Sequence, residues 1–264
     1  KKAKLFLDIR DIFKDTIEDI ITNPVFQLGS KPLFSYLERY AFTRASDINI
    51  VSEGFLEYLK KVAPGSNYHF YPNGIDNVFL DRLKAEEPNN HPKIVTYAGN
   101  IGEGQGLHLI IPELAKHFVG RIEFKLFGDG GRKSQLKAAL LAREVTNVEL
   151  LAPVSRIELI EIYKQADILF LHLNDYDAFL KVLPSKIFEY SAIGKPIWAG
   201  VSGFAAKFLH EYVSNVALFY PCDVGGAIES FEDLELKTQP RHEFLKTFSR
   251  KVIMKNMATD VLLT

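Results

Sequence analysis

Residues 94–106 read Ile94-Val95-Thr96-Tyr97-Ala98-Gly99-Asn100-Ile101-Gly102-Glu103-Gly104-Gln105-Gly106, a short apolar run followed by a glycine-rich loop. The apolar run predicts a buried strand over Ile94–Ala98, and apolar residues at helical spacing predict a helix over Leu107–Phe118. A strand, a short loop and a helix in this order make one βα unit. Because the same unit recurs along the chain, the sequence predicts a mostly parallel sheet.

The later units extend this pattern to residue 220. Because their strands are almost continuously apolar, helices should cover both faces of the sheet. Residues 93–239 are therefore predicted to form an α/β domain of the Rossmann-like, doubly wound type with a six-stranded parallel sheet. The further strands are expected at Ile122–Phe127, Val148–Ala152, Ile168–Leu173, Ile197–Ala199 and Ala217–Tyr220, and the further helices at Arg132–Arg143, Ser155–Gln165, Pro184–Ile193 and Phe204–Val213.

Shorter patterns flank this domain. Residues 1–75 contain too few strands for a complete parallel domain, so they are predicted to be part of an N-terminal domain, and the chain a piece of a longer one. The turn residues Pro72-Asn73-Gly74 and the polar stretch 85–92 favour an interdomain link at 76–92. Residues 240–264 are expected to form one or two terminal helices. The N-terminal elements are expected at Leu5–Ile9, Leu33–Thr43, Ile48–Val51, Gly54–Val62 and Tyr68–Tyr71.

The composition is that of a globular protein. The chain has 264 residues, of which 47% are hydrophobic, and its 32 basic and 33 acidic side chains nearly cancel. This balance gives no indication of nucleic-acid binding. The single cysteine, Cys222, excludes an intrachain disulfide and is compatible with a cytoplasmic location. The longest apolar runs are too short to span a bilayer, and no signal peptide is visible.

Two glycine-rich loops, residues 99–106 and 128–131, follow consecutive predicted strands and open helices. Glycine allows a ligand close to the backbone, and a helix N-terminus offers free amide groups to an anion. For either loop alone, a tight βα turn without a ligand is the favoured interpretation. The two adjacent loops, together with the helix that carries Lys186 and Glu189, predict a diphosphate site. A nicotinamide site is the rival prediction, because Asp129 ends the second strand. The dinucleotide motif G-x-G-x-x-G is absent, however, because its third glycine would fall at Leu107.

A third segment reads Leu183-Pro184-Ser185-Lys186-Ile187-Phe188-Glu189-Tyr190 and is closed by Gly194-Lys195-Pro196. Proline is accepted in the first turn of a helix, and Gly194 followed by Pro196 ends one, so a short helix is predicted. Lys186 and Glu189 then share a face, where a cation for a diphosphate and a carboxylate for a sugar diol project together. The alternative is an exposed ion pair.

Metal and nucleophile motifs are weak. Asp175-Tyr176-Asp177 has the D-x-D form that holds a divalent metal in some sugar transferases, but a solvated loop is favoured. No histidine pair has the spacing of zinc ligands, and neither a serine nor Cys222 lies in a nucleophile motif. No metal site is therefore predicted. His172, at the carboxyl end of its strand, is in a position to reach the cleft, but a hydrogen-bonded structural residue beneath the cleft is the favoured interpretation.

Several motifs occur together between about residues 40 and 225: Tyr71-Pro72-Asn73-Gly74-Ile75-Asp76, Tyr97-Ala98-Gly99-Asn100-Ile101-Gly102, Phe127-Gly128-Asp129-Gly130, Ala166-Asp167 and Pro184 to Pro196. In this combination the chain resembles retaining GT-B glycosyltransferases of family four, with the bacterial O-antigen and capsule enzymes as the branch it looks most like. The resemblance implies two Rossmann-like domains that face a cleft. It places the donor on the second domain and the acceptor on the first, with the terminal helices packed back across the first.

The resemblance also assigns residues. Glu189 matches the glutamate that accepts hydrogen bonds from the donor ribose, and Lys186 and the loop amides of Gly99, Asn100 and Gly102 match positions near the diphosphate. Residues 151–154 match the segment that packs on the nucleobase. The predicted donor-site residues are Gly99, Asn100, Gly102, Gly128, Asp129, Leu151, Val154, Pro184, Ser185, Lys186 and Glu189, and the predicted catalytic ones Lys181, Lys186 and Glu189.

Two departures from the family pattern stand out. Lys181 occupies the place of a glutamate that many members carry eight positions before the ribose glutamate, and Asn100 and Gln105 replace an arginine and a lysine of the first glycine-rich loop. We therefore expect Lys181 and Lys186 to supply the positive charge from the opposite wall. On the acceptor side, Arg10 and Asp11 follow the first strand and are expected to point toward the cleft, so they are the candidates for acceptor contact. An ion pair in a loop is an equally good interpretation of these two residues.

The resulting prediction is a glycosyltransferase that moves a sugar from a UDP-sugar to a glycan or lipid-linked acceptor in surface polysaccharide assembly. It needs no metal and no enzyme nucleophile, because backbone dipoles and cations stabilise the departing diphosphate. Peripheral contact with the membrane follows from the resemblance alone. Two alternatives remain open at this point, a non-catalytic nucleotide-sugar-binding subunit and a sugar-nucleotide epimerase on the same fold.

Overall fold

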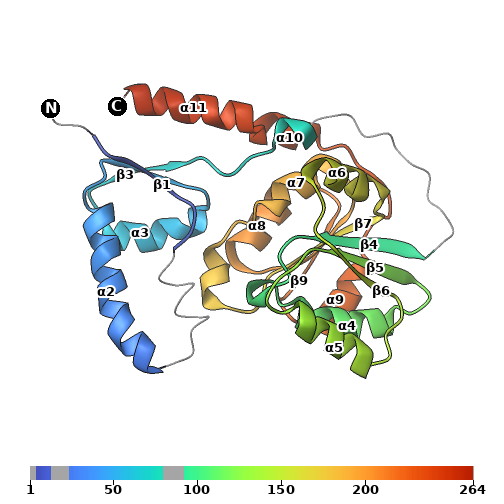
Figure 1. Cartoon of the computed structure of the whole chain (residues 1–264). Coiled ribbons are helices and arrows are strands. Elements are labelled where there is room, and N and C mark those ends of the chain that lie inside the picture. The colour runs from blue at the N-terminus through green and yellow to red at the C-terminus, as the bar shows by residue number, and fades with distance from the viewer. Residues whose placement is uncertain (1–3, 13–23, 80–91, 264) are drawn as a thin grey trace.

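A computed structural model describes residues 4–12, 24–79 and 92–263 of the chain (Figure 1). The larger of its two sheets is six-stranded and parallel, with the order β6-β5-β4-β7-β8-β9, which confirms the predicted doubly wound topology. The chain starts in the middle at β4, builds outward through β6 and then crosses over to β7. Its strands are β4 (Lys93–Ala98), β5 (Ile122–Phe127), β6 (Val148–Leu151), β7 (Ile168–His172), β8 (Ile197–Gly200) and β9 (Val216–Phe219).

Helices cover both faces of this sheet (Figure 1). One buried cluster packs Tyr163, Ile187 and Phe208 from α6, α7 and α8 against one face. A second cluster packs Leu114 from α4 and Ala227 from α9, with side chains of α5, against the other. These helices are α4 (Leu107–His117), α5 (Lys133–Ala142), α6 (Arg156–Gln165), α7 (Lys186–Ile193), α8 (Gly203–Tyr212) and α9 (Val224–Phe231).

The topology locates a crevice. Ligands of open α/β sheets bind beyond the carboxyl ends of the strands, where neighbouring connections leave in opposite directions. Here that point lies between β4 and β7, which pair in parallel at Val95–Ile168 and Thr96–Leu169. The loops after β4 and β5, which contain the two glycine-rich motifs, therefore emerge at the edge where a ligand is expected.

The N-terminal sheet has three parallel strands in the order β1-β2-β3. Its core is formed by buried side chains such as Ile48, Phe55 and Leu59. Its helix α2 begins at Pro24, nine residues before the predicted Leu33. The elements are β1 (Phe6–Ile9), α2 (Pro24–Phe42), β2 (Asp47–Ile50), α3 (Leu56–Val62) and β3 (Asn67–Phe70).

Several contacts among the described residues join the N-terminal part of the chain to the domain of the large sheet and to the terminal helices. Ser52 donates a hydrogen bond from its hydroxyl to the carbonyl of Lys181, in the 3₁₀ helix η4 (Asp177–Lys181). The terminal helix α11 (Arg250–Leu263) lies beside the N-terminal sheet, where the Tyr71 hydroxyl donates to Asp260 (Figure 1). The preceding helix α10 (His242–Phe248) packs on the large domain, where Phe244 contacts Phe188 of α7. Most of the predicted link at 76–92 lies outside the described residues. No helix within the described ranges has both the length and the apolarity to cross a membrane.

Candidate functional site

A pocket of about 440 Å³ opens at the predicted edge of the large sheet. Its walls come from the loops after β4, β5 and β6, from α6 and from the start of α7. Eight predicted donor-site residues line it: Gly99, Asn100, Gly128, Asp129, Val154, Ser185, Lys186 and Glu189. The other lining residues are Ala98, Phe127, Pro153, Leu159 and Tyr163. Gly102, Leu151 and Pro184 lie beside the lining residues in sequence but do not line the pocket.

The two glycine loops form the floor of the pocket by packing against each other. Gly99 and Gly128 have φ angles of 148° and 149°, which L-residues with a side chain rarely adopt. A Cβ atom on Gly128 would collide with the carbonyl oxygen of Gly99. The amide of Ile101 donates to the carbonyl of Asp129 at 2.7 Å, so the loops are also hydrogen-bonded. Glycine is therefore required here by close backbone approach.

In the first glycine loop, the uncharged residues Asn100 and Gln105 stand where the family resemblance leads one to expect an arginine and a lysine. Asn100 donates from Nδ2 to Oε1 of Gln105 at 3.0 Å, and its carbonyl accepts from the Tyr97 hydroxyl at 2.6 Å. These contacts fix the loop without adding positive charge to it. Positive charge at the floor of the pocket has to come from another element.

That element is α7. It begins at Lys186, two residues later than predicted, and ends at Gly194 in the left-handed conformation. The Lys186 ammonium lies against the backbone of Gly99 and 5.3 Å from the centre of the Tyr97 ring. Burial lowers the pKa of Lys186 and raises the pKa of Glu189, and each charge partly offsets the shift of the other. Two partly buried opposite charges thus face the same pocket, as the spacing predicted.

Three further residues around Glu189 were not assigned from the sequence. Arg156 Nη2 lies 3.9 Å from Glu189 Oε1 and also forms an ion pair with Asp76. The Tyr163 hydroxyl is buried beside Glu189 and has no hydrogen-bond partner among the described residues. Asp76 belongs to a motif that the sequence singled out, but Arg156 and Tyr163 follow only from the way α6 packs on α7.

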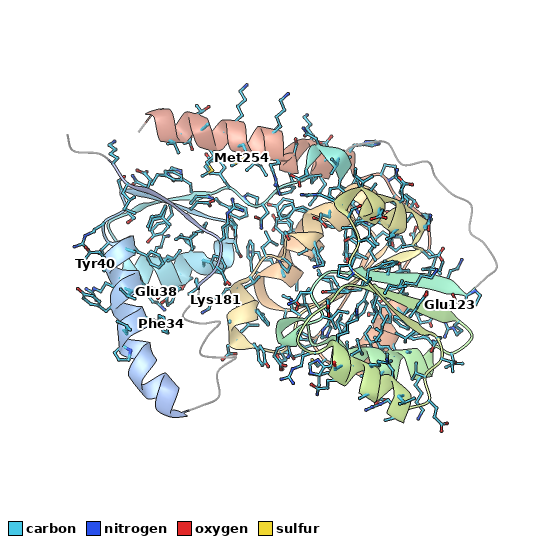
Figure 2. All side chains as sticks on the ribbon, in the orientation of Figure 1. Phe34, Glu38, Tyr40, Glu123, Lys181 and Met254 are labelled. Atoms are coloured by element: carbon cyan, nitrogen blue, oxygen red, sulfur yellow. The ribbon has the colours of Figure 1, made fainter. Side chains whose placement is uncertain are left out.

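Lys181 does not reach the pocket. It ends η4, and the extended residue Val182 turns the chain before α7 begins. The ammonium of Lys181 lies 5.4 Å from the centre of the Tyr58 ring on α3, between the N-terminal part of the chain and α8 (Figure 2). The expectation that Lys181 adds positive charge to the donor pocket is therefore not supported by its position.

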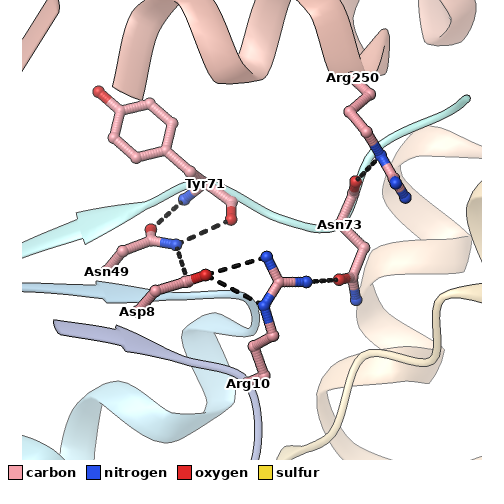
Figure 3. A network of polar contacts seen from close by, with 6 residues as sticks. All are labelled: Asp8, Arg10, Asn49, Tyr71, Asn73 and Arg250. Atoms are coloured by element: carbon pink, nitrogen blue, oxygen red, sulfur yellow. Dashed lines mark hydrogen bonds and ion pairs between the residues drawn. The ribbon is translucent and has the colours of Figure 1, made fainter. Parts of the chain in front are cut away.

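The predicted acceptor residues lie on the N-terminal side. Arg10 forms an ion pair with Asp8 at 2.9 Å and donates from Nη1 to Oδ1 of Asn73 at 3.0 Å (Figure 3). Asp11 is exposed just beyond β1. Neither residue lines the donor pocket.

The D-x-D motif forms loop contacts. Asp175 accepts a hydrogen bond from the Tyr220 hydroxyl at 2.9 Å, and Asp177 begins η4. Within the described part of the chain, no group of three or more histidine, cysteine, aspartate or glutamate side chains is arranged to hold a metal ion.

His172 is fully buried and hydrogen-bonded through both ring nitrogens. Its Nδ1 lies 2.7 Å from the carbonyl oxygen of Gln105, which only accepts, and its Nε2 lies 3.0 Å from the amide nitrogen of Cys222, which only donates. These partners require the neutral ring, with the proton on Nδ1. Burial lowers the pKa of His172 to about 4. It is a structural residue that ties β7 to two loops, as the sequence predicted.

His172 should make stability depend on pH. Because its pKa is lowered on folding, the unfolded chain takes up a proton first, and stability is lost as the pH falls from about 6.5 towards 4. Between pH 6.5 and 5, this residue should account for about 1.5 kcal/mol of lost unfolding free energy. Urea unfolding at the two pH values should show a smaller loss in His172→Gln than in the wild type. His210→Gln, at an exposed histidine, should keep the wild-type dependence, and an equal loss in His172→Gln would contradict the assignment.

Comparisons with known proteins agree with this geometry. The family model "Glycosyl transferases group 1" matches residues 81–251. Escherichia coli (strain K12) WcaI, named as a glycosyl transferase of colanic acid biosynthesis, is 27% identical over an alignment of 173 residues that covers 61% of this chain and 42% of WcaI. The chain thus spans less than half the length of that relative.

Solved structures share the fold. Sucrose-phosphate synthase from Thermosynechococcus elongatus superposes with a TM-score of 0.77 at 13% identity, over 98% of this chain and 67% of that one. HepE of Anabaena, in complex with UDP and glucose, has a TM-score of 0.70 at 16% identity, over 98% of this chain and 71% of its own. At these identities the likeness establishes the fold, and it confirms the predicted GT-B type.

Proposed function

Because the chain belongs to the group 1 glycosyl transferases, we propose that it transfers a sugar from a nucleoside diphosphate donor to an acceptor hydroxyl. One observation carries the proposal. A partly buried lysine and a partly buried glutamate, one helical turn apart on α7, face a pocket whose floor is made of two interlocked glycine loops. The cation and the loop amides suit a diphosphate, and the carboxylate suits the hydroxyls of a ribose.

We propose that the pocket holds all three parts of such a donor. The diphosphate is proposed to lie between Lys186 and the Gly99–Asn100 backbone, and the ribose against Glu189. The nucleobase then reaches the lining residues Phe127, Pro153 and Val154, where the wall is largely apolar. We propose a UDP-sugar as donor, in keeping with the fold shared with HepE, whose structure contains UDP and glucose.

The reaction proposed is a transfer with retention of configuration. The bond between the sugar C1 and the diphosphate oxygen breaks, the acceptor oxygen bonds to C1 from the same face, and the acceptor proton leaves with the diphosphate. Lys186 and the loop amides stabilise the negative charge that develops on the leaving group. In this proposal, neither a metal ion nor an enzyme nucleophile takes part.

The acceptor is proposed to be a glycan or lipid-linked sugar of surface polysaccharide assembly, bound from the side of the N-terminal sheet. Arg10 and Asp11 are the candidate contacts on that side. The proposed location is the cytoplasm, with peripheral contact to the inner face of the membrane. WcaI, of which this chain matches 42%, is named for colanic acid biosynthesis.

Replacing Glu189 with glutamine tests the donor assignment. The amide keeps one acceptor oxygen but loses the charge, so UDP affinity should fall about tenfold, which corresponds to about 1.4 kcal/mol. Calorimetric titration with UDP, GDP and ADP, each with its sugar derivative, measures this loss and identifies the preferred nucleobase. Glu161→Gln, at an exposed glutamate on α6 paired with Lys164, should bind as the wild type does. If the wild type binds no nucleoside diphosphate, or Glu189→Gln binds as tightly as the wild type, the proposal fails.

A further inference from the structure

A chain of polar contacts leads from Glu189 to the N-terminal sheet. Arg156 contacts Glu189 and Asp76, as described above, and the Oδ1 atom of Asp76 lies 2.8 Å from Nη1 of Arg250. Arg250 in turn donates from Nε to the carbonyl of Asn73 at 3.1 Å (Figure 3). Two arginines from α6 and α11 therefore share one carboxylate that belongs to neither helix.

The contacts of Asn73 continue this chain into the N-terminal sheet. The Asn73 side chain accepts from Arg10, which is paired with Asp8, and Asp8 accepts from Asn49 Nδ2 at 2.8 Å (Figure 3). The Asn49 Oδ1 atom also accepts a hydrogen bond from the backbone amide of Tyr71 at 2.8 Å, and Asn49 Nδ2 donates to the Tyr71 carbonyl at 3.2 Å. The segment that carries Asn73 and Asp76 is thus fixed at one end by the sheet and at the other by the two arginines.

The position of Arg156 is not explained by the stability of its own helix. It is the first residue of α6, where the helix dipole disfavours a cation, and the cap of this helix is already formed by Ser155 and Glu158. Its side chain is 53% exposed, whereas those of Asp76 and Glu189 are 17% and 22% exposed. The Arg156 guanidinium therefore forms ion pairs with two carboxylates that have little contact with solvent.

We propose that Arg156 is a positioning residue of the donor site: held by Asp76, it keeps the Glu189 carboxylate charged and directed at the donor ribose. This inference rests on the proposed function, because it assigns Glu189 to the ribose. It adds Asp76 and Arg250 as the groups that hold Arg156 in place. It also makes donor binding sensitive to the segment that leads from β3 to Asp76.

The charged and titratable groups around Glu189 fix the expected pH dependence. Three cations act on the Glu189 carboxylate: Lys186 on the same helix, Arg156 on α6 and Arg250 on α11. The Tyr163 hydroxyl of α6 lies beside the carboxylate, and Asp76 is paired with both arginines. Burial raises the pKa of Glu189, and the three cations oppose that rise. Without Arg156 the pKa should rise further, so the carboxylate should become protonated at a higher pH. Donor affinity should then weaken earlier as the pH falls.

The test is UDP affinity measured by calorimetry between pH 5.5 and 8 for wild type, Arg156→Gln and Arg156→Lys. Arg156→Gln should bind about threefold more weakly than wild type at pH 8 and at least tenfold more weakly at pH 5.5, while Arg156→Lys should restore most of the affinity. Arg143→Gln, which removes an exposed arginine paired with Glu113, is the matched control and should follow the wild-type curve.

Two combinations distinguish positioning from a general loss of structure. In a Glu189→Gln background, Arg156→Gln should no longer change the pH dependence, because the titrating group is gone. Asp76→Asn, which does not line the pocket, should weaken binding in the same direction, and its effect should not add to that of Arg156→Gln.

A loss that is the same at every pH, or that persists in the Glu189→Gln background, would overturn the inference and leave a structural role. If Arg156→Gln fails to fold, Asp76→Asn must still show the shifted pH profile while Arg156→Lys stays close to wild type, and a wild-type profile in Asp76→Asn would overturn the inference. The proposed function fails separately, through absence of UDP binding to the wild type or indifference to Glu189→Gln alone.

Discussion

Gly128→Ala should abolish measurable UDP binding and lower the free energy of unfolding by about 3 kcal/mol. The alanine methyl group would meet the carbonyl oxygen of Gly99, and the φ angle of 149° is itself unfavourable for any residue with a side chain. To relieve the clash between the methyl group and this oxygen, one glycine loop has to move away from the other. Because both loops line the pocket, a displacement of about 1 Å should cost at least about 100-fold in donor affinity. Calorimetric titration and urea unfolding measure the two effects.

Gly65→Ala is the control for Gly128→Ala. Gly65 has no positive φ angle, and a Cβ atom there would have no heavy atom within 4 Å. Its replacement should change neither UDP affinity nor stability by more than about 0.5 kcal/mol. If Gly128→Ala binds UDP as the wild type does, the two loops do not hold the donor in the way proposed.

The large sheet was predictable because each of its strands can be recognised from its own short stretch of sequence. Each of its six strands falls within one or two residues of the expected position, since a buried parallel strand is a short apolar run between loop signals. α9 was missed: its first turn contains Gly225 and Gly226, which weaken helix propensity, and tertiary packing of Ala227 and Phe231 compensates. Local preference alone does not indicate such a helix.

The site was predictable to the extent that its residues lie in one local motif. The loops at Gly99 and Gly128 and the pair on α7 each carry their own signal, and parallel topology brings their ends together. Arg156 and Asp76 meet Glu189 only through the packing of elements distant in sequence, so no spacing rule indicates them. The prediction for Lys181 came from its place in the family pattern, eight positions before Glu189, whereas the structure places its ammonium beside the Tyr58 ring of α3.

Lys186→Met should weaken UDP binding about 30-fold or more while leaving the affinity for uridine within about twofold. The lysine stem is replaced by an apolar chain of similar length, so the change removes the charge that faces the diphosphate and little of the packing. A charge-assisted hydrogen bond contributes about 1.5–3 kcal/mol, which sets the size of the loss. Parallel titrations with UDP and uridine separate loss of the phosphate contact from collapse of the pocket, because collapse would weaken both ligands equally.

The pH dependence gives an independent check on Lys186. Burial lowers its pKa, so in the wild type the affinity for UDP should decrease as the pH rises through that lowered pKa and the ammonium is lost. Lys186→Met should lack this alkaline decrease, whereas Lys137→Met, at an exposed lysine on α5, should retain it. The loss of UDP affinity at low pH, which we assign to protonation of Glu189, should persist in Lys186→Met. It should begin at a higher pH than in the wild type, because one of the three cations around that carboxylate is gone. If Lys186→Met lacks the loss of affinity at high pH and shows the loss at low pH earlier, the two charges on α7 act on one bound donor. If the loss of affinity at high pH is unchanged in Lys186→Met, the diphosphate binds elsewhere.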